Sequence, residues 1–155
     1  MCGPCQLEKQ TKSTHPKVNV VATSCPLELL HMDLMGPTRM ESMGGKRYIM
    51  VVVDDFLRYS WVEFLKEKLE ACDKMERLCK RLQNEKRVPI VKIRSDYGKE
   101  FENAKFVTFC NEHGIKKEFS TPKTPQQNGM VERKNQVIQE MARVILLNKN
   151  IPHKF

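Results

Sequence analysis

Three acidic residues occupy positions that are unusual for an acidic side chain. Asp33 interrupts the apolar run LELLHMDLM, Asp96 ends the β-branched run VPIVKIRSD, and Glu132 stands near the start of a long amphipathic segment. A buried carboxylate is costly unless it is paired or binds a metal ion. Carboxylate oxygens favour the hard cations Mg²⁺ and Mn²⁺, and two such ions about 4 Å apart can serve phosphoryl transfer. The three residues therefore predict a divalent-metal site in which Asp33 bridges two ions.

Each carboxylate also has an ordinary structural explanation. Asp33 could be a core acid with satisfied hydrogen bonds, and Asp96 could form a turn. Glu132 could pair with the adjacent Arg133 or Lys134, although surface ion pairs of that kind contribute only about 0–1 kcal/mol. Taken together with their flanking residues, the three carboxylates favour the metal site.

The elements that must position these carboxylates follow from two periodicities. Apolar and β-branched runs predict five strands, and apolar residues at three- and four-residue steps predict three helices. Expected strands cover residues 27–37, 47–53, 59–67, 88–96 and 115–120, and expected helices cover residues 69–86, 103–113 and 128–147. The order β-β-β-α-β-α-β-α predicts an α/β fold with helices packed on a five-stranded mixed sheet.

This order of elements brings the carboxylates together. The first three strands form an antiparallel meander, and the first helix then carries the chain back so that the fourth strand can lie beside the first. Asp33 would lie beside the end of the strand that holds Asp96, and the last helix would present Glu132 from the flank. The positive end of that helix dipole favours the ionised form of Glu132.

Composition narrows the class of protein and its partners. The 155 residues suffice for one domain with a real core, and 40% hydrophobic with 30% charged residues is typical of a globular chain. The net charge of +8 favours nucleic acid over a membrane as partner, although many soluble domains are merely basic. The sequence contains no run of about 18 apolar residues, so it predicts no membrane-spanning helix. Irregularly spaced cysteines and a polar start predict reduced thiols rather than a secreted disulfide framework.

Four stretches resemble the integrase core of copia-type LTR retrotransposons, and together they cover nearly all of residues 26–155. They are HMDLMGP, YIMVVVDDFLRYSWVEFLKEK, IRSDYGKEFEN and FCNEHGIKKEFSTPKTPQQNGMVERKNQVIQEMARVIL. The 35 residues between Asp96 and Glu132, positions 97–131, match the spacing typical of retroviral-type integrases. The resemblance implies an RNase H-like catalytic core over residues 25–155, truncated at its C-terminus. It assigns Asp33, Asp96 and Glu132 as the catalytic, metal-binding triad.

The activity implied by this resemblance is metal-dependent DNA strand transfer in two steps at one site. Water attacks near the 3′ end of the element's DNA, and the freed 3′-OH then attacks target DNA. The implied cofactor is Mg²⁺ or Mn²⁺, and the implied partner is DNA. The resemblance implies no membrane partner and is compatible with a homo-oligomer. Such a protein would be intracellular, in a cytoplasmic particle first and in the nucleus for its function.

DNA contacts are expected on the last helix, in the loop before it, and beside Asp96. The resemblance marks Asn135 and residues 125–129 as surroundings of the active site, while basic side chains would contact phosphate and glutamines would add polar contacts. A solvated helix face is the alternative for any single lysine. The residues expected to contact DNA are Lys99, Gln127, Arg133, Lys134, Asn135, Gln136 and Arg143.

The start of the chain carries half of a zinc site. A structural zinc ion needs four ligands, and Cys2 and Cys5 supply two. Integrases of this type place a histidine pair upstream of such a motif. Residues 1–24 are therefore expected to be the remnant of a zinc-binding pre-integrase region plus a linker, and zinc is not expected to bind.

Other acids and aromatic residues have simpler expected roles. Asp54 and Asp55 are adjacent on a strand and point to opposite faces, so both cannot serve one site. They are expected instead to cap a turn before Arg58. Trp61 is expected in the core. His31 shares the strand face of Asp33, and it could support a metal ligand or simply pack in the interior.

Two other classes of protein stay open. A catalytically inactive retrotransposon-derived fragment would bind nucleic acid or a protein; the missing flanking domains favour this class and the intact triad opposes it. A plain metal-dependent nuclease of the same fold would hydrolyse DNA without joining it.

Overall fold

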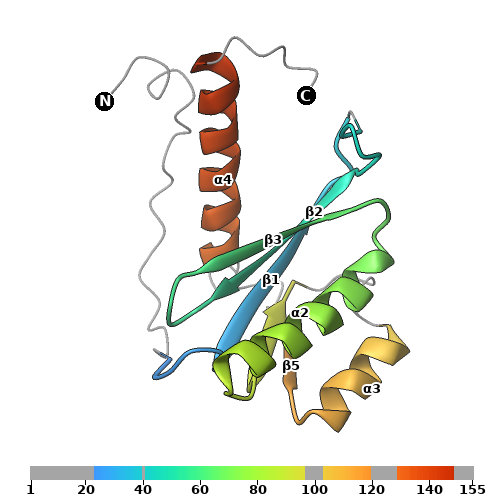
Figure 1. Cartoon of the computed structure of the whole chain (residues 1–155), viewed down its shortest axis with the longest axis vertical. Coiled ribbons are helices and arrows are strands. Elements are labelled where there is room, and N and C mark those ends of the chain that lie inside the picture. The colour runs from blue at the N-terminus through green and yellow to red at the C-terminus, as the bar shows by residue number, and fades with distance from the viewer. Residues whose placement is uncertain (1–22, 40, 97–102, 120–128, 149–155) are drawn as a thin grey trace.

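The computed structural model describes residues 23–39, 41–96, 103–119 and 129–148. These residues form a five-stranded mixed sheet with helices on both faces (Figure 1). The strands are β1 Leu29–Met35, β2 Tyr48–Asp54, β3 Ser60–Leu65, β4 Lys92–Ser95 and β5 Lys116–Phe119. The helices are α2 Glu70–Lys86, α3 Ala104–Glu112 and α4 Gly129–Asn148. The predicted α/β class and order of elements are confirmed.

The sheet has the strand order β3-β2-β1-β4-β5. The first three strands are antiparallel, while β4 pairs parallel to β1 and β5 pairs parallel to β4. The crossover through α2 therefore returns the chain beside β1, as the order of elements predicts. β4 begins at Lys92, later than the expected start at residue 88, and Pro89 has no N–H for a ladder bond at that end.

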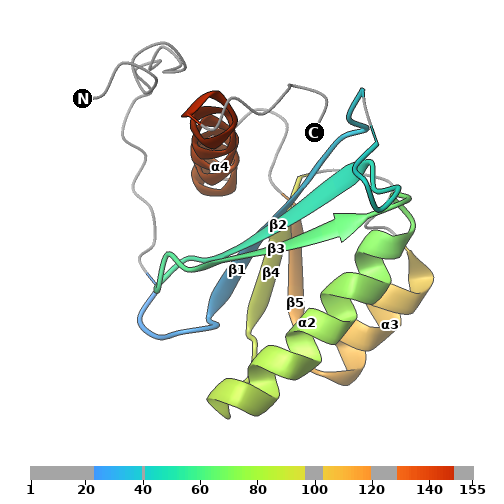
Figure 2. The same ribbon diagram turned by 45° about the horizontal axis from the view of Figure 1, so that its top comes forward.

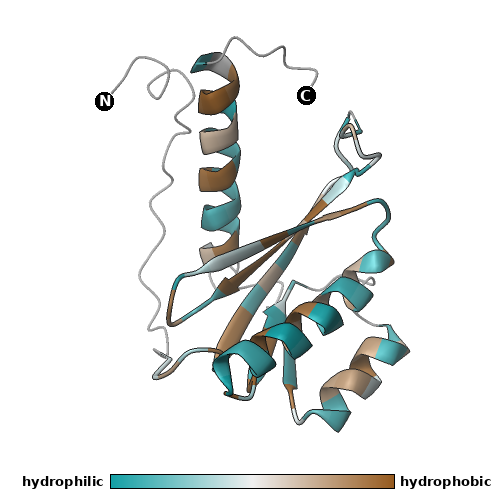
Figure 3. Ribbon diagram, in the orientation of Figure 1, coloured by the Kyte–Doolittle hydropathy of each residue, from teal (hydrophilic) through white to brown (hydrophobic). Residues whose placement is uncertain are grey.

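Helices α2 and α3 cover one face of the sheet, and α4 lies on the other (Figure 2). The outward surface of α2 is mostly hydrophilic (Figure 3), and its apolar stripe packs into the larger core with Phe106 of α3. None of the described helices is long and apolar enough to cross a membrane.

Strand β2 supplies both cores because its side chains alternate between the faces of the sheet. Met50 and Val52 point into the larger core under α2 and α3. Val51 and Val53 point the other way and form a smaller core with Val131 of α4. Trp61 packs against the larger core, as expected. The small core fixes the start of α4 on the sheet, close to the residues expected to do chemistry.

The four described cysteines are free thiols, which agrees with the expected reduced state. Cys25 is exposed, and the other three are buried. Burial raises the pKa of the Cys79 thiol to about 12, so this thiol stays protonated at neutral pH. Cys2 and Cys5 lie outside the described residues.

Replacing Gly36 with alanine is expected to destabilise the fold by about 1–3 kcal/mol. Gly36 follows β1 with φ +128, and a Cβ there would lie 2.7 Å from both the Arg47 carbonyl oxygen and Tyr48 Cδ1. Gly45→Ala is the matched control, because Gly45 also has a positive φ, +68, but a Cβ there would have nothing within 4 Å. Urea unfolding measures both variants. Equal losses of unfolding free energy in the two variants would show that the close approach of a Cβ at Gly36 to Arg47 and Tyr48 does not destabilise the fold.

Candidate active site

Asp33 lies on the central strand of the sheet, half-buried, on the face that α4 covers. In the parallel ladder between β1 and β4, Met32 pairs with Ser95. Asp96 is the next residue after Ser95, so it leaves the end of β4 beside Asp33. The predicted neighbourhood of these two carboxylates therefore follows directly from the register.

Glu132 is exposed in the first turn of α4, next to Val131, which anchors the helix in the small core. One turn later, the Nδ2 of Asn135 donates a hydrogen bond to Oδ2 of Asp33. Further along the same flank, Gln139 Nε2 lies 3.1 Å from Met35 Sδ. These contacts fix the Glu132 flank of α4 against β1.

The three carboxylates share one electrostatic environment. Burial and the negative charges of Asp96 and Glu132 raise the pKa of Asp33 to about 6, against an ordinary value of 3.8. The hydrogen bonds from the Leu34 N–H and from Asn135 act in the opposite direction. The carboxylates thus lie close enough to repel one another, and a cation among them would relieve that repulsion.

The donor set around Asp33 fits a hydrated divalent cation. Asn135 is 4% exposed, and its Oδ1 has no hydrogen-bond partner among the described residues. A neutral oxygen without a donor, beside mutually repelling carboxylates, offers the oxygen ligands that Mg²⁺ and Mn²⁺ favour. Within the described ranges, no three acidic, histidine or cysteine side chains already stand in ligand geometry. Side-chain rotation of the carboxylates would have to complete the site.

The residues expected to contact DNA fall into separate groups. Gln136 and Arg143 follow Glu132 by four and eleven positions and so lie on its flank of α4. Asn135 turns inward to Asp33. Arg133 and Lys134 instead line a pocket with residues of β2 and of the β2–β3 turn. Lys99 and Gln127 lie outside the described residues, as does most of the loop 125–129.

His31 is a packed histidine that bonds to an acid outside the proposed triad. Its Nε2 lies 3.1 Å from Oδ1 of Asp55, and both side chains are buried. Asp55 also accepts a 2.8 Å hydrogen bond from Thr23 Oγ1. Burial lowers the pKa of His31, so the ring is neutral at neutral pH. No pattern in the sequence indicates these contacts, because Thr23, His31 and Asp55 come from three separate segments of the chain.

Asp54 caps the turn before Arg58, as predicted, but the same prediction is wrong for Asp55, whose carboxylate contacts Thr23 and His31 instead. Its Oδ1 accepts hydrogen bonds from the N–H groups of Phe56 at 2.9 Å and Leu57 at 2.8 Å. Its Oδ2 accepts a further bond of 2.8 Å from the Leu27 N–H, which was not foreseen. Asp54 therefore has a structural role, and its carboxylate faces away from the triad.

A further charged cluster lies on the sheet face that carries Asp33. Glu118 on β5 is 2.9 Å from Nη2 of Arg94, 3.1 Å from Nζ of Lys92 and 3.6 Å from Nζ of Lys116. Burial acts to raise the pKa of Glu118, but the hydrogen bonds from Arg94 and Lys92 outweigh it and lower the pKa. One carboxylate thus compensates three cations beside the candidate site, and sequence reasoning missed Glu118.

Comparison with known proteins gives a consistent family and fold. The family model described as the integrase core domain matches residues 23–125, a range that contains Asp33 and Asp96 and ends before Glu132. A retrovirus-related Pol polyprotein from transposon TNT 1-94 of Nicotiana tabacum is 33% identical over 159 residues, covering 99% of this chain and 12% of the polyprotein. The corresponding polyprotein from transposon RE2 of Arabidopsis thaliana is 30% identical, covering 99% of this chain and 10% of that protein.

A solved intasome of simian T-cell lymphotropic virus, in complex with PP2A regulatory subunit B56 gamma, has a similar fold. The TM-score is 0.67 at 18% identity, covering 95% of this chain and 50% of that chain. This likeness confirms the expected RNase H-like fold. The chain spans only 10–12% of the length of the two plant polyproteins.

Proposed function

The chain belongs to the integrase core domain family, and we propose that it is a metal-dependent polynucleotidyl transferase acting on DNA. It would process the 3′ ends of an element's DNA and join them to target DNA. The observation that carries this proposal is the register that sets Asp96 beside Asp33, with Glu132 raising the pKa of Asp33 from the flank.

Asp33, Asp96 and Glu132 would hold Mg²⁺ or Mn²⁺ in this proposal, with Asn135 Oδ1 as a nearby neutral oxygen. When bound, such ions lower the pKa of an attacking water or hydroxyl and stabilise the leaving oxygen. The proposal assigns no role to zinc. The proposed partner is DNA and the proposed place of action is the nucleus.

The chain's own residues would position the reacting groups. Asn135 restricts the rotamer of Asp33 through its amide hydrogen bond, so the central carboxylate is oriented before substrate arrives. Gln136 and Arg143 extend the Glu132 flank and would hold DNA backbone along it. Attack by water, and later by the freed 3′-OH, would each exchange one P–O bond for another without a covalent enzyme intermediate. Positioning and charge neutralisation would then supply most of the rate.

The test is a Mn²⁺-dependent reaction on a branched DNA substrate, which reports strand transfer by the catalytic core alone. Resealed, joined products support a transferase. Hydrolysed products without joining would assign the chain to the metal-dependent nucleases instead. No products from a folded chain that also fails to bind Mn²⁺ by calorimetry would favour the alternative, a catalytically inactive fragment that binds nucleic acid or protein.

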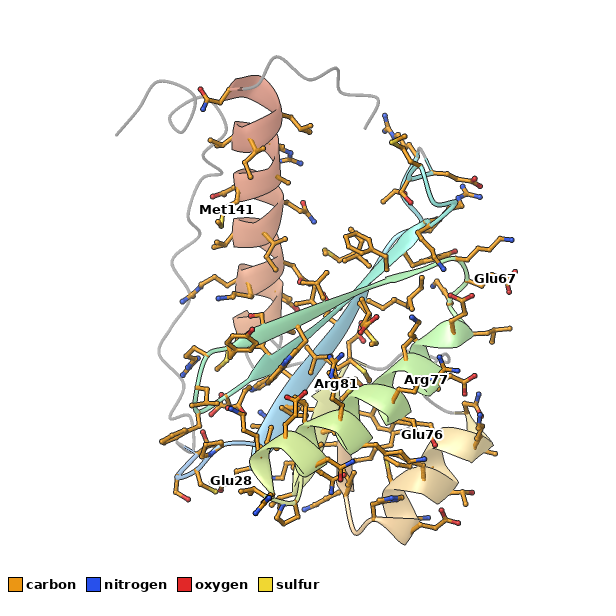
Figure 4. The ribbon with its side chains drawn as sticks, in the orientation of Figure 1. Glu28, Glu67, Glu76, Arg77, Arg81 and Met141 are labelled. Carbon is orange, nitrogen blue, oxygen red and sulfur yellow. The ribbon has the colours of Figure 1, made fainter. Side chains whose placement is uncertain are left out.

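Glu118→Gln is expected to tighten DNA binding severalfold, and to steepen the dependence of log K on log salt by about one. The change removes the one carboxylate that compensates Lys92, Arg94 and Lys116 beside the candidate site. Fluorescence anisotropy with a short labelled duplex measures both quantities. Glu76→Gln is the matched control, since Glu76 pairs with Lys80 at 2.6 Å on α2, on the opposite face of the sheet (Figure 4). Equal effects of both variants on DNA affinity and on the salt slope would mean that the net charge of the protein, and not the position of the carboxylate, determines the change.

A further inference from the structure

A basic pocket lies on the flank of α4 that faces away from Asp33. A pocket of about 200 Å³ opens between the start of α4 and the end of β2 with its following turn. Its lining is Val53, Arg58, Met130, Arg133, Lys134 and Val137. Three of these six residues are cations, and none is acidic.

The cations of this pocket form no close ion pair with a described residue, unlike others on the molecule, and Arg58 interacts with the Asp55 carboxylate only from beyond ion-pair distance. Among the described residues, no carboxylate lies within ion-pair distance of Arg58, Arg133 or Lys134. By contrast, Lys92 and Arg94 share Glu118, and Lys105 lies 2.7 Å from Asp73. Three like charges around one pocket repel one another, so an anionic ligand there would relieve the repulsion.

The pocket is held in place by packing and by the turn before β3. Arg58 sits in the left-handed region at φ 57, and its N–H donates to the Asp54 carbonyl at 2.9 Å. Its Nη1 lies 2.8 Å from the sulfur of Met130. Val131 anchors the same turn of α4 in the small core. Arg58 is thus aimed across the pocket from a second element, which no single basic helix face would provide.

The two flanks of α4 present different chemistry. Asn135 and Gln139 contact β1 on the flank of Glu132, whereas the pocket residues meet Val53 of β2. The floor of the pocket is apolar, with Val137 42% exposed. An apolar floor ringed by cations complements the sugar face and the phosphates of a nucleic-acid backbone.

We propose that Arg58, Arg133 and Lys134 bind the phosphodiester backbone of DNA in this pocket, on the flank of α4 opposite Glu132. The inference rests on the proposed function only in that DNA is the partner; it requires no catalysis. It assigns to Arg58 a function that sequence reasoning did not give it. It also separates Arg133 and Lys134 from the DNA contacts beside the carboxylates.

The test compares Arg58→Gln with Arg81→Gln in binding to a labelled 20-base-pair duplex in EDTA, over a series of salt concentrations. Both changes remove one positive charge, and Arg81 lies on α2, on the opposite face of the sheet (Figure 4). Arg58→Gln keeps the Cβ, so the backbone strain at this position is unchanged. We expect Arg58→Gln to weaken binding about fivefold near 0.1 M salt and to reduce the salt slope by about one. Arg81→Gln should leave the slope unchanged.

Lys134→Gln serves as a second variant should Arg58→Gln lose its fold, which thermal unfolding would show. Unchanged slopes in both variants, with parent protein that still binds DNA, would overturn the pocket as a DNA site and leave the proposed function standing. Loss of binding to polyglutamate in these variants, with DNA binding intact, would assign the pocket to an acidic peptide instead. If Glu132→Gln no longer joins DNA ends but binds DNA with the same salt slope as the parent protein, DNA binding at this pocket does not depend on catalysis.

Discussion

Asp33→Asn is expected to lower metal-dependent DNA strand transfer by at least about a thousandfold, because metal ions supply several kcal/mol of transition-state stabilisation. The same substitution should raise the melting temperature of the metal-free protein by a few degrees. Asp33 is held beside two other negative charges in a half-buried position, and burial with those charges raises its pKa to about 6. A neutral amide of the same shape removes the repulsion while it also removes the ligand. Stability and activity therefore change in opposite directions.

The pH dependence of this effect has a definite sign. The folded state holds the proton of Asp33 up to about pH 6, whereas the unfolded chain releases it near the ordinary value of 3.8. Ionised Asp33 therefore destabilises the fold increasingly between these values, and fully above pH 6. The gain in melting temperature of Asp33→Asn should be largest above pH 6 and should vanish near pH 4. Added Mn²⁺ should stabilise the parent protein and leave the variant unchanged.

Differential scanning calorimetry with and without Mn²⁺ provides the measurement, alongside the branched-DNA assay. Glu67→Gln is the control, because Glu67 is an exposed carboxylate between β3 and α2 (Figure 4). It should change neither activity nor the response to Mn²⁺. Full strand transfer by Asp33→Asn would remove Asp33 from the proposed site.

The fold could be predicted from the sequence because each element carries its own period. The run of Val51, Val52 and Val53 indicates a strand buried on both faces, and the two cores confirm it. The neighbourhood of Asp33 and Asp96 could also be predicted, since a crossover helix sets the parallel pairing of β1 with β4.

Contacts between distant segments could not be predicted in the same way. The sequence places Arg133 and Lys134 next to Glu132, but a helix turns about 100° per residue, so adjacent side chains meet different strands. The hydrogen bond from Asn135 to Asp33 and the pairing of His31 with Asp55 depend on how α4 and the turn after β2 dock. Periodicity carries no information about such side-chain geometry.

Asp54→Ala is expected to destabilise the protein by about 3 kcal/mol or more, since each unsatisfied N–H costs about 1 kcal/mol or more. Asp54 is fully buried and accepts hydrogen bonds from the N–H groups of Leu27, Phe56 and Leu57. The bond to Leu27 supports a residue with an unfavourable positive φ of 64. Its loss should loosen both the entry to β1 and the turn that carries Arg58. Chemical unfolding of the purified variant measures the change.

Asp54→Asn distinguishes this structural role from a role in metal binding. The amide keeps one oxygen, which can still accept from Phe56 and Leu57, but its NH₂ group would face the Leu27 N–H. Its cost should therefore lie between zero and that of Asp54→Ala. Binding of Mn²⁺ should be the same as in the parent protein, since the Asp54 carboxylate is occupied by backbone donors. A variant that folds normally but no longer binds Mn²⁺ would place Asp54 among the ligands.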